Sequence, residues 1–241
     1  MVLETALIIA GGKGTRLEER VEDLPKVLIP VEGVPLIERT ILWLKSNNVK
    51  NIVLGVAYQK ERVKSYLGNG DSLGVKIHYV EHDENGGTGD AFKADITQAI
   101  EGGLIKEDNF YAMNADQITD LELKGLTNTH LKTGAVATIV TVKLKTNFGI
   151  VEVDEEKRIT KFQEKWEVPS IRINSGIYVF NKKIIDYLVS GNIEETTFRK
   201  LAQEGKIRAF FYDGEWLTVN DKKELKKAEE YLKQFGSLLN N

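Results

Sequence analysis

Short apolar runs alternate with amphipathic stretches along the first half of the chain. The apolar runs predict strands at residues 6–10, 51–57, 75–81 and 109–113. The stretches between them carry apolar residues at helical spacing and predict helices at residues 35–47, 59–67 and 88–100. Strands that alternate with helices are typical of a parallel sheet covered on both faces, so we predict a doubly wound α/β fold.

The second half of the chain is richer in strand patterns. We predict strands at residues 135–142, 171–180 and 207–212, and a hairpin formed by residues 149–153 and 159–164. Helices are predicted at residues 182–189, 194–204 and 221–235. We see no linker or internal repeat, and we expect one domain over residues 1–241 whose middle forms a lid-like β-rich extension.

Composition excludes several classes of protein. The chain has 241 residues, 41% of them hydrophobic, which is enough for a packed core. The net charge of −3 argues against nucleic-acid binding, which requires an excess of Lys and Arg. The lack of cysteine excludes disulfides and thiolate chemistry. The first apolar run is too short for a signal peptide and no run reaches the ~20 residues of a membrane span, so we expect a cytoplasmic protein.

A glycine-rich turn, GGKG at residues 11–14, directly follows the first predicted strand. Glycines let backbone N–H groups approach a ligand closely, because no Cβ intervenes. Lys13 lies within the turn, Arg16 follows it, and Lys26 comes after an acidic stretch. Amide donors combined with cationic side chains predict a phosphate-binding site at the end of this strand.

The spacing of the turn departs from both common phosphate fingerprints. Lys13 lies between glycines, where a P-loop places its lysine after the last glycine. Leu17 stands where a dinucleotide-binding turn has its third glycine, which weakens the alternative of an NAD-dependent oxidoreductase. An ordinary turn at a strand end is the remaining alternative for the glycines alone.

The run GGKGTRL, followed by LPKVLIPV, resembles the signature of the sugar-1-phosphate nucleotidyltransferases. The resemblance implies a Rossmann-like core with a β-rich, sugar-binding extension, the nucleotide being bound by about residues 1–120 and the sugar by about residues 121–241. It implies transfer from a nucleoside triphosphate to a sugar 1-phosphate, with Mg²⁺ as cofactor and pyrophosphate as product. The expected partners are these two substrates and possible further copies of the chain, with no nucleic acid and no membrane.

The resemblance also implies roles for individual residues of the nucleotide site. Arg16 and Lys26 are the expected catalytic residues. The run GGTGDA at residues 86–91 resembles the family's base-binding turn, and His82 stands about where relatives place a base-reading Gln or Glu. A lone histidine is alternatively a packing residue. The full set of expected nucleotide-binding residues is Ala10, Gly11, Gly12, Gly14, Thr15, His82, Gly87 and Thr88.

The implied metal site is Asp116 together with Asn220. Asp116 lies in MNADQITD, which resembles the family's Asn-Gly-Asp segment, and a carboxylate there suits Mg²⁺. Thr218 stands where many members have the second metal-binding Asp. The run VND at residues 219–221 resembles that of the N-acetylglucosamine-1-phosphate uridylyltransferases. We therefore expect Asn220 to be the second metal ligand in place of that Asp, with Asp221 as the fallback ligand. Asn220 could alternatively cap the last helix.

The implied sugar-phosphate site comes from four separate segments. FQEKW resembles the family's Glu-Lys run, NSG resembles its Asn-x-Gly run, and Phe148-Gly149 resembles its Tyr-Gly pair. A surface ion pair and a β-bulge are the alternatives for the first and the last. The expected residues are Asn114, Gly149, Glu164, Lys165 and Asn174.

Two questions stay open in the sequence. The replacement by Thr218 leaves room for a catalytically weak nucleotide- or sugar-phosphate-binding protein of the same fold. The base is also unassigned, because LPKVL and VND favour uridylyltransferases and residues 55–70 favour guanylyl- or thymidylyltransferases.

Overall fold

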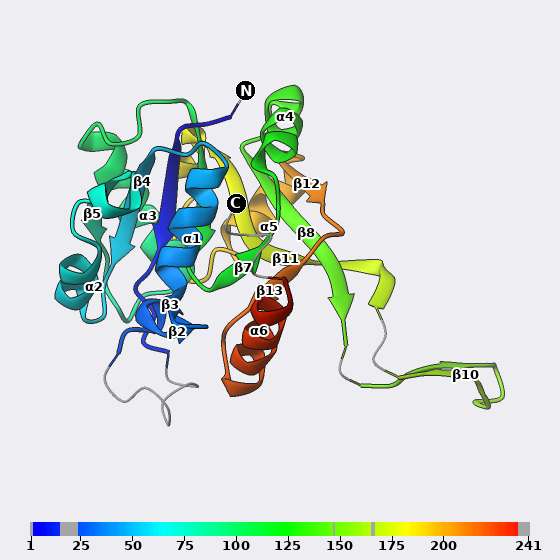
Figure 1. The fold of residues 1–241 in the computed structure, drawn as a ribbon. Coiled ribbons are helices and arrows are strands. Elements are labelled where there is room, and N and C mark those ends of the chain that lie inside the picture. Colours follow the sequence, from blue (N-terminus) through cyan, green and yellow to red (C-terminus); the bar gives the residue numbers. More distant parts are fainter. Residues whose placement is uncertain (1, 15–23, 147, 165–166, 236–241) are drawn as a thin grey trace.

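A seven-stranded sheet forms the centre of the molecule (Figure 1). The computed structural model describes residues 2–14, 24–146, 148–164 and 167–235. The strand order across the sheet is β12-β8-β11-β6-β1-β4-β5. These strands are β1 (Thr5–Ile9), β4 (Asn51–Val56), β5 (Lys76–Glu81), β6 (Asn109–Asn114), β8 (Ala137–Lys145), β11 (Glu167–Asn181) and β12 (Ile207–Phe211).

Strand β11 runs antiparallel to both of its neighbours, β6 and β8. The other strand pairs of the sheet are parallel. The mostly parallel sheet predicted from the sequence is therefore confirmed. Because the chain continues from β1 to β4 on one side and β6 lies on the other, the strand order reverses next to β1, where sheets of this class bind ligands.

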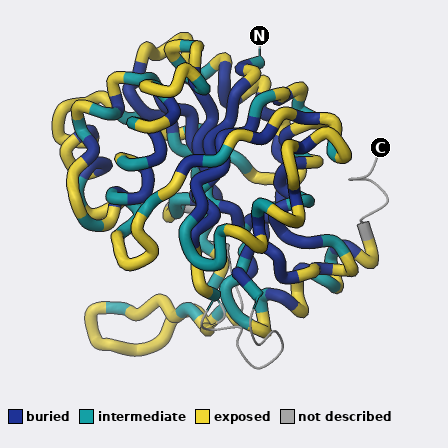
Figure 2. Tube along the Cα trace, turned by 90° about the vertical axis from the view of Figure 1, so that its left-hand side faces the viewer, coloured by how far each residue is buried: buried dark blue, intermediate teal, exposed yellow. Residues whose placement is uncertain are grey.

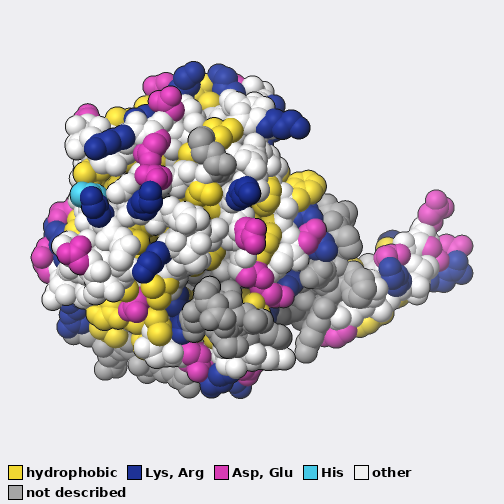
Figure 3. All heavy atoms as spheres, turned by 45° about the horizontal axis from the view of Figure 1, so that its top comes forward, with side chains coloured by type: hydrophobic (Ala, Val, Ile, Leu, Met, Phe, Trp, Pro, Cys, Tyr) yellow, Lys and Arg dark blue, Asp and Glu magenta, His cyan; other side chains and the backbone are white. Residues whose placement is uncertain are grey.

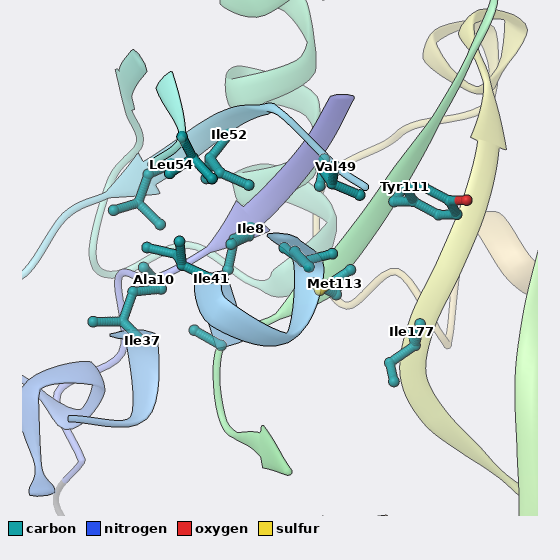
Figure 4. Packing of buried hydrophobic residues seen from close by; sticks show 14 of the residues in the cluster. Ile8, Ala10, Ile37, Ile41, Val49, Ile52, Leu54, Tyr111, Met113 and Ile177 are labelled. Atoms are coloured by element: carbon teal, nitrogen blue, oxygen red, sulfur yellow. The ribbon is translucent and has the colours of Figure 1, made fainter. Parts of the chain in front are cut away.

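Helices cover both faces of the sheet, which confirms the doubly wound arrangement. Alternate residues of each central strand face opposite sides: Ile8 and Leu54 belong to one apolar cluster, and Leu7 and Val53 to the other. Figure 4 shows the first cluster, and Figure 2 shows the buried strands at the centre of the molecule. The first face is covered by α1 (Leu36–Ser46), α2 (Lys60–Leu67) and α4 (Leu123–Thr133), and the second by α3 (Thr88–Glu101) and α5 (Thr197–Gln203).

The last described helix, α6 (Lys222–Phe235), packs beside the sheet in a third apolar cluster. Leu225 and Leu232 of α6 lie there with Ile118 and Leu217. The two latter residues belong to the antiparallel strands β7 (Gln117–Thr119) and β13 (Trp216–Thr218). The cluster also contains Val31 of β2 (Pro30–Val31), a short strand that pairs with β3 (Val34–Pro35). The C-terminal part of the chain is thereby attached to the segment that follows β6.

The predicted lid-like middle is smaller than expected. Among the described residues, the segment that projects from the body is the hairpin of β9 (Ile150–Val153) and β10 (Ile159–Gln163) (Figure 1). Its neighbours β8 and β11 belong to the main sheet, because their apolar positions are buried on it. Charged side chains of both signs gather at the tip of the hairpin, where Arg158 pairs with Asp154 and Glu156 (Figure 3).

Helix α4 was missed by the sequence patterns because it contains Gly125, three Thr residues and one Asn, which are poor helix formers. Tertiary packing overrides this preference: a Cβ at Gly125 would lie 3.2 Å from the ring of Phe210. None of the helices in the described part of the chain has the length and apolar character that a membrane span needs.

Helix α4 also buries an imidazole. His130 is 2% exposed; its Nδ1 lies 2.8 Å from the Thr138 hydroxyl and its Nε2 lies 3.0 Å from the side-chain oxygen Oδ1 of Asn109. Burial disfavours the charged ring and lowers the pKa of His130 to about 4.

The pKa of His130 predicts a loss of stability as the pH falls. The unfolded chain binds a proton on His130 at a higher pH than the folded chain does, so folding becomes less favourable from about pH 6.5 down towards pH 4. Between pH 7 and pH 5 we expect His130 to account for about 2 kcal/mol of lost unfolding free energy. Urea titrations of the wild type and His130→Gln measure this difference. An equal loss in both proteins would contradict the prediction.

Candidate active site

Three side chains from distant parts of the chain meet at one point. The Lys26 ammonium donates to Asp116 Oδ2 at 2.6 Å and to Asn220 Oδ1 at 2.7 Å. The Lys26 side chain is 15% exposed and that of Asp116 is 21% exposed. The structure thus brings together one expected catalytic residue and both expected metal ligands, and we call these three residues the ion cluster.

The backbone fixes each member of the ion cluster. Lys26 begins a 3₁₀ helix, Lys26–Leu28, whose next two residues are buried. Asp116 lies between β6 and β7, and Asn220 comes two residues after β13. Because β7 and β13 pair and the Val219 amide donates to the Asp116 carbonyl at 3.0 Å, the two oxygen-bearing side chains start from adjacent backbones.

Glu224 was not anticipated as part of the site. Its Oε2 accepts from the Asn220 amide at 2.8 Å and from the Thr218 hydroxyl at 2.9 Å, which holds the backbone before α6. Asp221 Oδ1 in turn accepts from the Glu224 amide at 2.8 Å, so Asp221 caps the helix. The Asn220 side chain is therefore directed at Lys26 and not used as a cap. The spacing Asp221-x-x-Glu224 is a capping-box pattern, so the contact between the Glu224 amide and the Asp221 side chain could have been predicted from the sequence.

The glycine-rich turn adjoins the ion cluster. Gly14 has φ +72°, a left-handed conformation, and a Cβ there would lie 3.0 Å from Lys26 Cβ. The Lys26 amide donates to the Gly12 carbonyl at 3.4 Å. Before the turn, Ala10 is buried and its amide donates to the Gly55 carbonyl at 2.7 Å. The described part of the turn therefore lies between the end of β1 and Lys26. The expected residues Thr15 and Arg16 lie outside the described residues.

His82 contacts the other end of the turn. A Cβ at Gly11 would lie 2.2 Å from His82 Nε2, so the ring packs directly against the glycine. The side chain is 5% exposed, and Nδ1 lies 2.9 and 3.1 Å from the two carboxylate oxygens of Asp95. The ring is thus held from behind by an acidic partner that the sequence patterns did not identify.

The turn at residues 86–89 is engaged with another part of the chain. Cβ atoms at Gly87 and Gly89 would lie 2.5 and 2.6 Å from the backbone of Gly191. The Gly87 amide donates to Asp90, and the Thr88 hydroxyl accepts from the Ile193 amide. These glycines are therefore explained by close packing of two chain segments. Base binding by Gly87 and Thr88 stays a prediction.

The expected sugar-phosphate residues fall into two groups. Asn114 and Asn174 lie on either side of Gly176: Asn174 Oδ1 accepts from the Gly176 amide, and a Cβ at Gly176 would lie 2.9 Å from Asn114 Nδ2. Gly149 and Glu164 lie together at the base of the hairpin and are exposed, and their close contacts are with each other and with Phe162. The structure does not join this second group to the ion cluster. Lys165 lies outside the described residues.

The oxygen atoms of the ion cluster suit a divalent cation. Asp116 and Asn220 direct a carboxylate and an amide oxygen at one positively charged atom, and Mg²⁺ prefers such oxygen ligands. Over the described ranges, no group of three or more His, Cys, Asp or Glu side chains is arranged to hold a metal. Mg²⁺ is commonly bound by one or two protein carboxylates completed by water and substrate phosphates, and the donor set at Asp116 and Asn220 fits that mode.

The family model described as nucleotidyl transferase matches residues 5–232. The chain belongs to this family.

Several members of the nucleotidyl transferase family resemble the chain over most of its length. It is 33% identical to a UTP–glucose-1-phosphate uridylyltransferase of Synechocystis over 89% of this chain and 59% of the relative. It is 31% identical to a D-glycero-alpha-D-manno-heptose 1-phosphate guanylyltransferase of Campylobacter jejuni over 89% of this chain and 93% of the relative. Besides the Synechocystis protein, three further relatives are matched by the chain over only 54 to 58% of their own length.

Solved structures show the same architecture. The HddC protein of Yersinia pseudotuberculosis matches with a TM-score of 0.74 at 25% identity, over 95% of this chain and 100% of the other. A putative glucose-1-phosphate thymidylyltransferase of Bacillus anthracis matches with a TM-score of 0.72 at 21% identity, over 98% and 95% of the two chains. This second likeness supports the fold alone.

A pair of glycine substitutions tests the contact between the turn and Lys26. Gly14→Ala and Gly33→Ala both place alanine at a positive φ, +72° and +75°, and each should cost about 1–2 kcal/mol of stability. Only Gly14→Ala crowds Lys26, because a Cβ at Gly33 meets nothing within 4 Å. We expect similar urea midpoints for both variants and at least tenfold weaker nucleoside triphosphate binding for Gly14→Ala alone, measured by calorimetry. Equal binding by the two variants would refute the role of this contact.

Proposed function

We propose that the chain transfers a nucleotidyl group from a nucleoside triphosphate to a sugar 1-phosphate and releases pyrophosphate. The observation that carries this proposal is the ion cluster, in which Lys26, Asp116 and Asn220 meet beside the glycine-rich turn. The names of the relatives support it, because they describe uridylyl and guanylyl transfer to hexose and heptose 1-phosphates.

The reaction requires positioning and charge neutralisation and no covalent enzyme intermediate. An oxygen of the sugar phosphate attacks the α-phosphorus, and the bond from this phosphorus to the oxygen bridging to the β-phosphorus breaks. The electron pair leaves with pyrophosphate, and no proton transfer is needed because the attacking oxygen is already anionic. The amides of residues 11–14 would hold the leaving phosphates, together with Arg16 as the family resemblance implies.

Lys26 has two potential sets of partners. Its ammonium is held by Asp116 and Asn220 in this structure, and a triphosphate would offer it phosphate oxygens within the same small volume. Asp116 and Asn220 would then hold Mg²⁺, which supplies further neutralisation of phosphate charge when bound. Lys26 would stabilise the charge that develops on the reacting phosphates.

The sugar site would adjoin the ion cluster. Asn114 is two residues from Asp116, and Asn174 lies on the other side of Gly176 from Asn114. The two side-chain amides are thus placed to meet sugar hydroxyls. Gly149 and Glu164 belong to the hairpin base, and we propose that they contact the sugar from that side, together with Lys165 as the family resemblance implies.

A second candidate function is nucleotide binding without turnover. It is favoured by Thr218, whose hydroxyl donates to Glu224. The family resemblance implies a metal-binding Asp at position 218 in many members. This alternative predicts binding of a nucleoside triphosphate with no release of pyrophosphate.

A pyrophosphate-release screen separates the two functions. Five nucleoside triphosphates, including dTTP, are combined with several sugar 1-phosphates in the presence of Mg²⁺. We expect release that depends on one base, on a sugar phosphate and on Mg²⁺. Absence of release in every combination, with a nucleotide still bound, would establish the alternative.

Lys26→Ala tests the role of the ion cluster in turnover. Removing one preorganised charge donor costs roughly 10²–10³ in rate, so we expect kcat/KM to fall by that factor while the circular dichroism spectrum is unchanged. Lys50→Ala is the matched control, because Lys50 forms an exposed salt bridge with Glu4 and should leave kcat/KM within about twofold. Wild-type turnover in Lys26→Ala would refute the role of Lys26.

A further inference from the structure

Asp95 and His82 form a buried polar pair behind the glycine-rich turn. Asp95 belongs to α3 and is 0% exposed, and His82 directly follows β5. The carboxylate also packs against the backbone of β4: a Cβ at Gly55 would lie 1.7 Å from Asp95 Oδ2. Glycine at position 55 is therefore needed to admit the carboxylate to the sheet.

The pair fixes the orientation and the tautomer of the His82 ring. Both carboxylate oxygens of Asp95 face Nδ1, so Nδ1 carries the proton and donates it. In the neutral ring Nε2 then bears a lone pair and accepts hydrogen bonds. Within the described part of the chain, Asp95 is the hydrogen-bond partner of the ring, and Nε2 lies against Gly11 with no hydrogen-bond partner there.

Nε2 lies at the end of the turn opposite Lys26. The same Gly11 Cβ position that meets Nε2 would also meet Ala57 Cβ at 2.8 Å, so the carboxyl ends of β1, β4 and β5 converge here. Gly14, by contrast, packs on Lys26. A nucleotide with its phosphates at Lys26 would therefore extend along the turn towards His82, in the crevice where doubly wound sheets bind ligands.

A buried carboxylate requires a reason beyond packing. Its desolvation is unfavourable, and apolar side chains of the same volume would fill the space without that penalty. Burial raises the pKa of Asp95, and the hydrogen bond from His82 acts in the opposite direction. What the carboxylate provides that an apolar residue cannot is control over which ring nitrogen carries the proton.

We propose that Asp95 is a positioning residue for base selection: it holds His82 with Nε2 as an acceptor that recognises bases bearing an imino N–H, namely uracil, thymine and guanine. Cytosine and adenine have an acceptor nitrogen at the corresponding position and would face the Nε2 lone pair unfavourably. This inference rests on the proposed function only in requiring that a nucleotide occupies the turn.

The test is calorimetric binding of UTP, dTTP, GTP, CTP and ATP at pH 8, without sugar phosphate. For the wild type we expect the tightest ligand to be one of the first three, with CTP and ATP at least tenfold weaker. In Asp95→Ala, the ratio of affinities between the preferred nucleotide and CTP or ATP should fall to threefold or less, because binding of the preferred nucleotide is weakened. Asp95→Asn, which keeps an oxygen acceptor for Nδ1, should retain most of the ratio. His130→Gln, a substitution at a buried histidine of α4, is the control and should retain all of it.

Nitrogen NMR of the imidazoles supplies a readout that loss of packing would not produce. In the wild type at pH 8 we expect His82 to be protonated on Nδ1, and in Asp95→Ala on Nε2, the tautomer that free imidazoles of histidine favour. If Asp95→Ala does not fold, His82→Phe replaces it in the binding series, because it fills the same space without Nε2. The expected result is again a ratio of threefold or less.

Three outcomes would overturn the inference: CTP or ATP as the tightest ligand, an equal loss of affinity for all five nucleotides in Asp95→Ala, or a wild-type His82 protonated on Nε2. Each can be distinguished from failure of the proposed function. Base selectivity that depends on Asp95, without pyrophosphate release, would leave the inference standing and remove the reaction. Pyrophosphate release with a base selectivity that is unchanged in Asp95→Ala would support the reaction and overturn the inference.

Discussion

The candidate site depends on the Lys26 ammonium group lying between an oxygen atom of Asp116 and one of Asn220. Lys26 reaches Asp116 across 90 residues of sequence and Asn220 across 194, so the ion cluster exists only when three distant segments are in register. Each segment is fixed by a different kind of contact. A turn of glycines positions Lys26, the end of a buried strand positions Asp116, and a capped helix positions Asn220. An error in any one of them would leave a charge without its partner in a partly buried place, which is costly.

The sheet supplies the geometry that makes this meeting possible. Strands β1 and β6 are neighbours, so the glycine-rich turn after one lies beside the acidic segment after the other. The antiparallel strand β11 then brings Asn174 next to Asn114, and the β7–β13 pair brings the C-terminal segment back to Asp116. The groups that we propose for phosphate, cation and sugar therefore lie along one edge of the sheet. The fold itself is common to many chemistries, and the side chains at this edge are what indicate this one.

Much of the architecture could be predicted from the sequence, because apolar runs and helical periodicity are local signals. The predicted helix at residues 59–67 and the strand at 109–113 match α2 and β6 to within one residue. Helix α4 was missed because packing against Phe210 outweighs its poor helix formers. In the site, Lys26, Asp116 and Asn220 could be chosen only through resemblance to a family. Contacts such as Asp95 with His82, or Gly87 with Gly191, leave no local pattern and could not have been foreseen.

The dependence of the ion cluster on α6 has a consequence for how the protein is made. During synthesis the glycine-rich turn and Asp116 leave the ribosome long before Asn220, and until then Lys26 has only one of its two oxygen partners. The central strands can pair in this interval, since β1, β4, β5 and β6 are all complete by residue 114. A growing chain would thus acquire its scaffold early, and Lys26 would gain its second oxygen partner only after residue 220 had been made.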